Sequence, residues 1–133
     1  MQRRAADGCR FVFHLAGLVS HERQDTDRLQ AINVAGTQTV VAALEAGARL
    51  VHVSSVSAFG PALAADMPVD ETSPLPTLAE RFPYAASKHA GEQAVLEGDV
   101  DAVIANPGFL LGPGDRYRVS TWPVHRYLSG NLR

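Results

Sequence analysis

The sequence is poor in cysteine, with only Cys9 among its 133 residues. A single cysteine cannot form an internal disulfide, which is typical of proteins from a reducing compartment. The five histidines do not show the close spacing of metal ligands, and the sequence has no Gly-x-Ser-x-Gly motif. The sequence therefore argues against a disulfide-stabilised fold, a metal centre and a serine hydrolase.

The sequence also lacks a large excess of positive or negative charge. The 12 Lys and Arg residues and 14 Asp and Glu residues give a net charge of −2, which leaves no basic footprint for nucleic acid or an anionic membrane. No apolar run reaches the roughly 18 residues that would cross a membrane. Basic residues precede the apolar run 11–19, as in a signal peptide, but His14 interrupts that run and no small-residue cleavage site follows. We therefore expect a cytoplasmic protein that binds neither nucleic acid nor membrane.

Lysine is almost absent. Among the 12 Lys and Arg residues only Lys88 is a lysine, and it follows Tyr84 by four positions at the start of a predicted helix. Residues four apart lie on one helix face, and a compact ammonium differs chemically from a planar guanidinium. The pair indicates a site that needs an ammonium near a phenol. The alternative is an ordinary surface lysine in the first turns of a helix.

The predicted elements alternate between strands and helices. Short apolar runs predict strands at 11–16, 49–54 and 100–105. Apolar or small residues at three- and four-residue steps predict a helix from Leu29 that ends before Gly47, and Pro83 and Gly98 bound a second helix over 84–97. The expected fold is α/β, a Rossmann-like doubly wound parallel sheet with right-handed crossovers and a strand 11–16 that is buried on both faces.

Candidate functional residues follow the predicted strands. In parallel α/β sheets ligands bind beyond the carboxyl ends of the strands, where residues 15–17, 54–55 and 107–109 stand. The proline-rich connection 57–83 is long for a compact domain, which is typical of a lid or binding loop. A weak signal for a short helix follows Pro123.

Five motifs stand in order along the chain. They are Phe13-His14-Leu15-Ala16-Gly17, Asn33-Val34-Ala35-Gly36-Thr37, Val53-Ser54-Ser55 running on to Phe59-Gly60, Tyr84-x-x-x-Lys88, and Asn106-Pro107-Gly108. In this order they resemble the motifs of the extended short-chain dehydrogenase/reductases, the NAD-dependent epimerase/dehydratase family. The resemblance covers roughly residues 11 to 130.

The resemblance implies a catalytic set. Tyr84 would be the acid/base, and Lys88 would stabilise its phenolate and hydrogen-bond the nicotinamide ribose. Ser55 would orient the substrate hydroxyl or carbonyl, with Ser54 and Ser57 as weaker candidates. The implied cofactor is NAD or NADP.

The resemblance also implies a cofactor-binding set. Asn33 would support the edge of the active site, although a helix polar group that is bonded locally is an equal alternative. Small residues after the first strand would let the backbone approach the cofactor. The full set is Leu15, Ala16, Gly17, Asn33, Ser54, Tyr84, Lys88, Pro107, Gly108 and Phe109.

The chain departs from the family pattern in several places. Phe59 stands where many relatives have tyrosine, which changes little if the ring only packs. Val56 and Ser57 stand where sugar-nucleotide 4,6-dehydratase relatives carry an acidic pair, which disfavours elimination and favours a reductase or epimerase. The family's glycine-rich turn for the pyrophosphate is missing, and so is its C-terminal substrate lobe.

Residues 1–133 are therefore expected to be a partial NAD(P)-binding domain, the central part of a longer enzyme or a truncated product. The expected partner is a small-molecule substrate, namely a sugar nucleotide, a steroid-like compound or another alcohol or ketone. The competing interpretation is a non-catalytic remnant or binding module of the same fold. An uncovered edge at strand 11–16 predicts association, for example as a homodimer.

Overall fold

The computed structural model describes residues 5–62, 66–73, 81–115 and 120–131. Its strands are β1 (Phe11–His14), β2 (Arg49–Val53) and β3 (Ala102–Ala105), and its helices include α2 (Thr26–Leu29), α3 (Gly36–Ala43), α4 (Pro83–Leu96) and α5 (Trp122–Leu128). A π-helical segment, Gln30–Ala35, joins α2 to α3, and 3-10 turns cover Arg23–Asp25 and Val56–Phe59. The predicted alternation of strands and helices is confirmed, and the short helix expected after Pro123 begins at Trp122.

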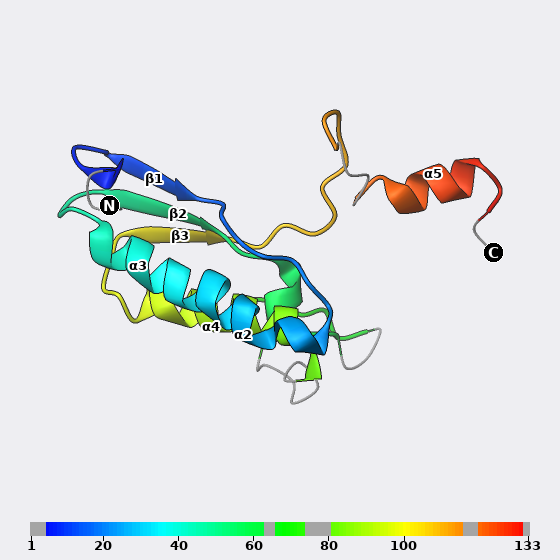
Figure 1. Cartoon of the computed structure of the whole chain (residues 1–133), viewed down its shortest axis with the longest axis horizontal. Helices are drawn as coiled ribbons and strands as arrows, with labels where there is room; N and C mark the ends of the chain where they lie inside the picture. Colours follow the sequence, from blue (N-terminus) through cyan, green and yellow to red (C-terminus); the bar gives the residue numbers. More distant parts are fainter. Residues whose placement is uncertain (1–4, 63–65, 74–80, 116–119, 132–133) are drawn as a thin grey trace.

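The three strands form one parallel sheet in the order β1-β2-β3. Phe13 lies opposite Val51, and Val51 lies opposite Val103. Parallel neighbours need a crossover connection, which α2 and α3 provide between β1 and β2, and α4 provides between β2 and β3 (Figure 1). The expected α/β architecture is thus confirmed as a three-stranded, Rossmann-like parallel sheet.

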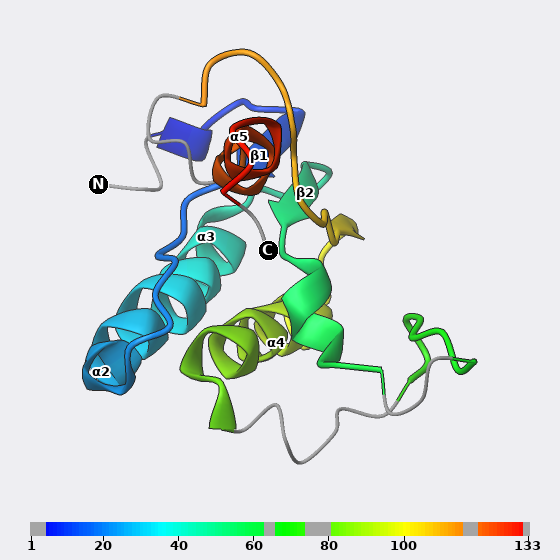
Figure 2. The same ribbon diagram turned by 90° about the vertical axis from the view of Figure 1, so that its right-hand side faces the viewer.

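One face of this sheet is covered by α2, α3 and α4 (Figures 1 and 2). Successive strand residues point to opposite faces, and on the covered face Leu50 and His52 are 0% and 1% exposed. On the helices that cover this face, Leu29 and Val95 are 0% and 2% exposed. The core of the described residues therefore lies between the sheet and these helices.

The other face of the sheet is open. Phe11, Phe13 and Val103 are 54%, 64% and 48% exposed. The expectation that strand 11–16 is buried on both faces is therefore wrong for the described residues, because α2, α3 and α4 all lie on one side and α5 stands beyond the carboxyl ends of the strands (Figure 1). An apolar run identifies a strand, but it does not say whether a second layer of helices covers it.

The carboxyl ends of β2 and β3 stay joined past the strands themselves. The backbone N–H of Ser54 donates to the carbonyl of Ala105 at 2.8 Å, and that of Val56 donates to the carbonyl of Pro107 at 3.0 Å. The 3-10 turn Val56–Phe59 then packs against α4. This brings the end of β2 and the first turns of α4 into one region.

The rest of the predicted lid 57–83 includes residues 63–65 and 74–80, which lie outside the described residues, so its role stays a prediction. No described helix is both long and apolar enough to span a membrane.

Candidate functional site

Lys88 is buried, with 6% of its surface exposed. Its Nζ donates a hydrogen bond to the carbonyl oxygen of Val53, the last residue of β2, at 2.9 Å. Burial lowers the pKa of the Lys88 ammonium, and the nearby Glu92 carboxylate opposes that shift. The surface-lysine alternative is therefore wrong. A buried ammonium at the carboxyl end of a parallel strand is typical of a functional site.

Helix α4 presents Tyr84 one turn before Lys88 because Pro83 starts the helix. Pro83 stands in the first turn of α4, where its missing N–H has no intrahelical partner to lose. Tyr84 and Lys88 are then four residues apart, so they share one face. The helix directs Lys88 to the strand end, while Tyr84 lines an open cavity.

Asn33 links the chain after β1 to α4. Its Oδ1 accepts from the backbone N–H of Leu18 at 2.7 Å, and its Nδ2 donates to the carbonyl of Leu18 at 3.0 Å and to Oγ of Ser87 at 2.9 Å. Ser87 in turn donates to the carbonyl of Tyr84 at 2.8 Å. Asn33 is 3% exposed, and these partners are distant in sequence. The local-bonding alternative is therefore wrong, and Asn33 joins two parts of the site.

Two residues that sequence reasoning missed make this link possible. Ser87 is fully buried between Asn33 and the first turn of α4. Gly91 faces the π-helical segment so closely that a Cβ there would lie 2.9 Å from the carbonyl oxygen of Asn33, a contact that only glycine permits. The signal for both was their place on the same helix as Tyr84 and Lys88, three and seven residues after the tyrosine.

Gly17 lies beside the same cluster. A Cβ at Gly17 would be 3.3 Å from Oδ1 of Asn33 and 3.9 Å from Nζ of Lys88. The backbone that follows β1 therefore passes close to the ammonium. Leu15 and Ala16 precede it and are exposed.

The serines at the end of β2 have different surroundings. Ser54 is 6% exposed, and its Oγ has no hydrogen-bond partner among the described residues. Oγ of Ser55 accepts from the backbone N–H of Ser57 at 3.2 Å and so caps the 3-10 turn. Ser57 lines the same cavity as Tyr84. The hydroxyl hydrogen of Ser55 remains free to donate to another group.

The residues predicted after β3 are less enclosed. The carbonyl of Pro107 accepts from Val56, whereas Gly108 is exposed and Phe109 is 78% exposed. Gly17, Asn33 and Lys88 thus lie close together in the structure, whereas Phe109 is exposed.

Two histidines lie buried behind Lys88. The rings of His14 and His52 are 5.1 Å apart, and Nε2 of His14 shares a 3.0 Å hydrogen bond with Oγ1 of Thr37. Burial, with the charge of Lys88 and the ring of His14 as smaller causes, lowers the pKa of His52 to about 4. Burial and then Lys88 also lower the pKa of His14. From the sequence, both histidines were interpreted as ordinary strand residues, and no sequence pattern indicated that they lie near the Lys88 ammonium.

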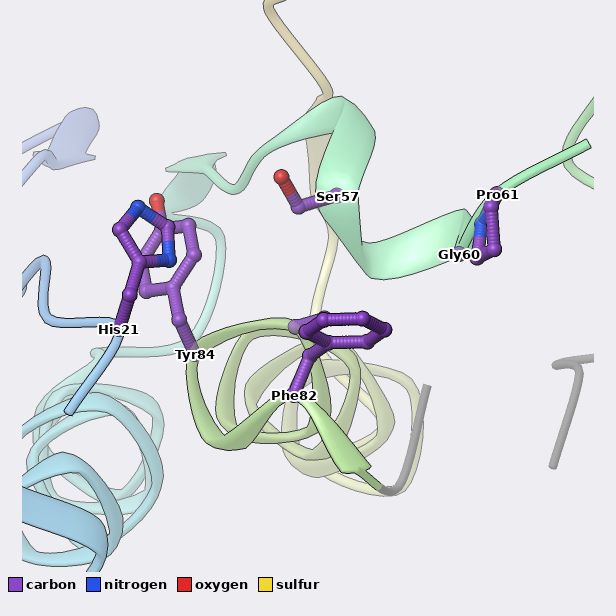
Figure 3. Close-up of a pocket in the computed structure, with 7 residues that line it drawn as sticks. His21, Ser57, Gly60, Pro61, Phe82 and Tyr84 are labelled. Atoms are coloured by element: carbon purple, nitrogen blue, oxygen red, sulfur yellow. The ribbon is translucent and has the colours of Figure 1, made fainter. Parts of the chain in front are cut away.

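A cavity of about 290 Å³ opens next to Tyr84 (Figure 3). The ring of His21 meets the ring of Tyr84 edge-on, with centroids 5.7 Å apart and planes at 78°. The Ser57 hydroxyl points toward these two rings, and the Phe82 ring lies below it (Figure 3). The complete lining among the described residues is His21, Ser57, Gly60, Pro61, Phe82, Tyr84 and Ala85. Sequence reasoning missed His21 and Phe82.

Comparison with known families gives one clear match. The family model described as "NAD dependent epimerase/dehydratase family" matches residues 2–131. A ceramide reductase of Caulobacter vibrioides is 34% identical over 113 residues, which are 84% of this chain and 29% of the relative. A 3 beta-hydroxysteroid dehydrogenase/Delta 5-->4-isomerase of vaccinia virus is 32% identical over 127 residues, 86% of this chain and 36% of the relative.

Solved structures agree with this match. The crystal structure of gox2253 superposes with a TM-score of 0.80 at 31% identity and covers 98% of this chain and 41% of that one. A short-chain dehydrogenase/reductase superfamily protein from Agrobacterium tumefaciens with bound NAD superposes with a TM-score of 0.66 at 31% identity and covers 79% of this chain and 33% of that one. The chain spans about a third of the length of the curated relatives it matches.

Proposed function

This chain belongs to the NAD-dependent epimerase/dehydratase family, and from that premise we propose that it is the catalytic segment of a nicotinamide-dependent oxidoreductase or epimerase acting at a carbinol or carbonyl carbon. The observation that carries the proposal is the buried Lys88, which is fixed to the end of β2 one helical turn from Tyr84. An ammonium that is removed from water and placed near a phenol is suited to acid/base chemistry.

Tyr84 is the proposed acid/base. In the oxidative direction its phenolate oxygen takes the proton of the substrate hydroxyl, and in the reductive direction its phenol returns that proton to the carbonyl oxygen. Lys88 stabilises the phenolate through its charge. Ser55 donates a hydrogen bond from its Oγ to the substrate oxygen, since capping the 3-10 turn uses that Oγ only as an acceptor. Ser57, which lines the cavity, is the alternative donor.

The residues fit the nicotinamide end of NAD or NADP. One N–H of the Lys88 ammonium donates to the carbonyl oxygen of Val53, which leaves two N–H groups that can donate to ribose hydroxyls. Gly17 has no side chain, and a Cβ at this position would lie 3.9 Å from Nζ of Lys88, so the backbone leaves room for a flat group to approach the ammonium. Oγ of Ser54, which has no hydrogen-bond partner among the described residues, is a further polar atom at this edge of the sheet. When bound, the cofactor takes up or gives a hydride. Leu15, Ala16, Asn33, Pro107, Gly108 and Phe109 remain proposed as the surrounding residues.

Reduction or epimerisation is favoured over elimination. Val56 and Ser57 open the 3-10 turn, and neither can act as the second acid or base that dehydration of a sugar nucleotide needs. The proposed substrates are alcohols or ketones, including steroid-like compounds and sugar nucleotides.

A non-catalytic module is the second candidate. The observation that favours it is the open surroundings of the residues after β3, where Gly108 is exposed and Phe109 is 78% exposed. Such a module would keep the fold and contact a nicotinamide or a partner without turnover.

A saturation-transfer NMR experiment with NAD tests the proposal and distinguishes the candidates. We expect transfer to the nicotinamide and its ribose to exceed transfer to the adenine, with an affinity no tighter than roughly millimolar, and we expect Lys88→Met to abolish it. Turnover of a panel of secondary alcohols by a protein that also contains the glycine-rich half then separates enzyme from module. Transfer to the adenine alone, or transfer that survives Lys88→Met, would refute the proposed role of the site.

A further inference from the structure

We propose that the cavity beside Tyr84 is the subsite for an uncharged, apolar ring portion of the substrate, and that His21 positions the substrate oxygen there. This inference rests on the proposed function, because it places the substrate against the proposed acid/base. It narrows the substrate from alcohols and ketones in general to hydrophobic cyclic ones.

The chemistry of the lining indicates such a ligand. None of the described residues that line the cavity is Asp, Glu, Lys or Arg. Pro61, Phe82 and Ala85 supply apolar surface, and the polar side chains in the described lining are those of His21, Ser57 and Tyr84. Apolar walls with a few convergent polar atoms are typical of sites for small hydrophobic ligands. A volume of about 290 Å³ suits a ring system of modest size.

Among the described residues, the positive charges that a sugar nucleotide would need lie outside this cavity. A diphosphate is usually bound by arginine or lysine, and two described arginines close to the start of α4 are Arg23 and Arg81. They line a different hollow, together with Pro83 and Ala86. A ligand seated in the cavity beside Tyr84 therefore meets no cation in its described lining.

His21 is held in place by its neighbours in sequence. The carboxamide of Asn33 binds both backbone polar groups of Leu18, and Oγ of Ser20 donates to Oδ2 of Asp25 at 2.7 Å. The same Oγ accepts from the backbone N–H of Glu22 at 3.2 Å. The loop is thus fixed immediately before and after His21, so its contact with Tyr84 is a built feature of the site.

The geometry of His21 suits a positioning role. Its ring meets Tyr84 edge-on (Figure 3), an arrangement favoured between aromatic rings. An imidazole N–H beside the phenol can donate to the oxygen that Tyr84 protonates or deprotonates. His21 therefore positions the substrate oxygen, while Tyr84 moves the proton.

The test is histidine-selective NMR of the whole chain titrated with 1-decalone, an uncharged bicyclic ketone, and separately with UDP-glucose. We expect 1-decalone to shift the His21 signal saturably and UDP-glucose to leave it unchanged. Phe82→Ala should weaken 1-decalone binding at least about tenfold, while His125→Gln on α5 serves as the matched control with no effect. Equal or tighter binding of UDP-glucose at His21, or unchanged binding in Phe82→Ala, would overturn the inference.

A second pair of variants separates positioning from packing. His21→Phe keeps an aromatic ring against Tyr84 but loses the donor, and His21→Asn loses the ring but keeps a donor. We expect His21→Asn to bind 1-decalone several-fold more tightly than His21→Phe. The reverse order would show that only the ring matters and would refute the positioning role.

The failures of the two proposals are distinguishable. Tyr84→Phe should still bind 1-decalone but should not turn over any alcohol. Binding of 1-decalone by a protein that also contains the glycine-rich half and never turns over supports the subsite and refutes the catalytic proposal. Turnover without a His21 response to any cyclic ketone refutes the subsite and leaves the catalytic proposal standing.

Discussion

Asn33 and Ser87 are hydrogen-bonded at 2.9 Å across the buried contact between the π-helical segment and α4. Through this bond the loop after β1 and the turn between Tyr84 and Lys88 become one unit, since Asn33 also binds Leu18 and Ser87 binds the carbonyl of Tyr84. A side chain that satisfies three polar groups at once cannot be replaced without leaving some of them unpaired.

The first prediction follows from this link. Asn33→Ala leaves the N–H and the carbonyl of Leu18 without their side-chain partner and removes one of the two hydrogen bonds of the Ser87 hydroxyl, and an unpaired buried group costs about 1–3 kcal/mol. We expect the free energy of unfolding to fall by about 2–4 kcal/mol, measured by urea denaturation. Asn131→Ala is the control because Asn131 is exposed after α5. A loss below about 0.5 kcal/mol would contradict the assigned role.

The second prediction concerns Tyr84. In a protein that also contains the glycine-rich half, Tyr84→Phe should lower turnover roughly 100- to 10,000-fold, because the phenolic oxygen that moves the proton is lost. Cofactor affinity should stay nearly unchanged, which calorimetric titration would show. Tyr127→Phe is a matched control, since Tyr127 is 72% exposed on α5. Turnover within about threefold of the parent would rule out Tyr84 as the acid/base.

The third prediction concerns the shape of the cation at position 88. Lys88→Arg keeps the charge but places a wide planar group where Nζ bonds Val53 and the Cβ position of Gly17 is 3.9 Å away. We expect it to weaken nicotinamide binding about as much as Lys88→Met does and to shift the pH–rate profile. The comparison is made by titration of NAD into the three proteins. A Lys88→Arg variant that binds and turns over like the parent would show that charge alone suffices.

The fourth prediction is a pH dependence of stability. In the unfolded chain His52 titrates near 6.5, but in the folded protein its pKa is lowered to about 4. Between these values only the unfolded chain binds the proton, so stability is full above pH 6.5 and is lost as the pH falls toward 4. The loss should reach about 3 kcal/mol, since one pKa unit corresponds to about 1.4 kcal/mol.

A variant of His52 and a control variant test whether His52 causes this pH dependence. His52→Leu should flatten the fall in the free energy of unfolding over that window, while His125→Gln, which alters an exposed residue of α5, should not. The pKa values of Asp25 and Asp70 are lowered from 3.8, so these carboxyl groups change the stability mainly below the pH range of 4 to 6.5 in which His52 acts. An unchanged slope in His52→Leu would mean that other groups control acid stability.

The sequence predicted the strands, the Tyr84–Lys88 pair and the place of the site at the strand ends because these depend on periodicity and local spacing. It did not predict that His21 adjoins Tyr84, or that His14 and His52 lie behind Lys88, because those contacts join residues far apart in the chain and follow from packing. Asn33 was ambiguous for the same reason: one sequence position is compatible with a local bond or a distant one, and only the fold places Ser87 within reach.

The last prediction concerns the open side of the sheet. Among the described residues β1 pairs only with β2, so its other edge offers unpaired backbone groups, and Phe11 and Phe13 add exposed apolar surface beside that edge. Such an edge is a template for pairing with another chain. We expect the 133-residue chain to form dimers or larger species in size-exclusion chromatography with light scattering. Phe13→Lys should shift it toward monomer because a charged edge strand resists pairing, whereas Leu128→Lys, at a residue that is 77% exposed on α5, should not. A monodisperse parent chain would contradict this account and would mean that the edge is protected in another way.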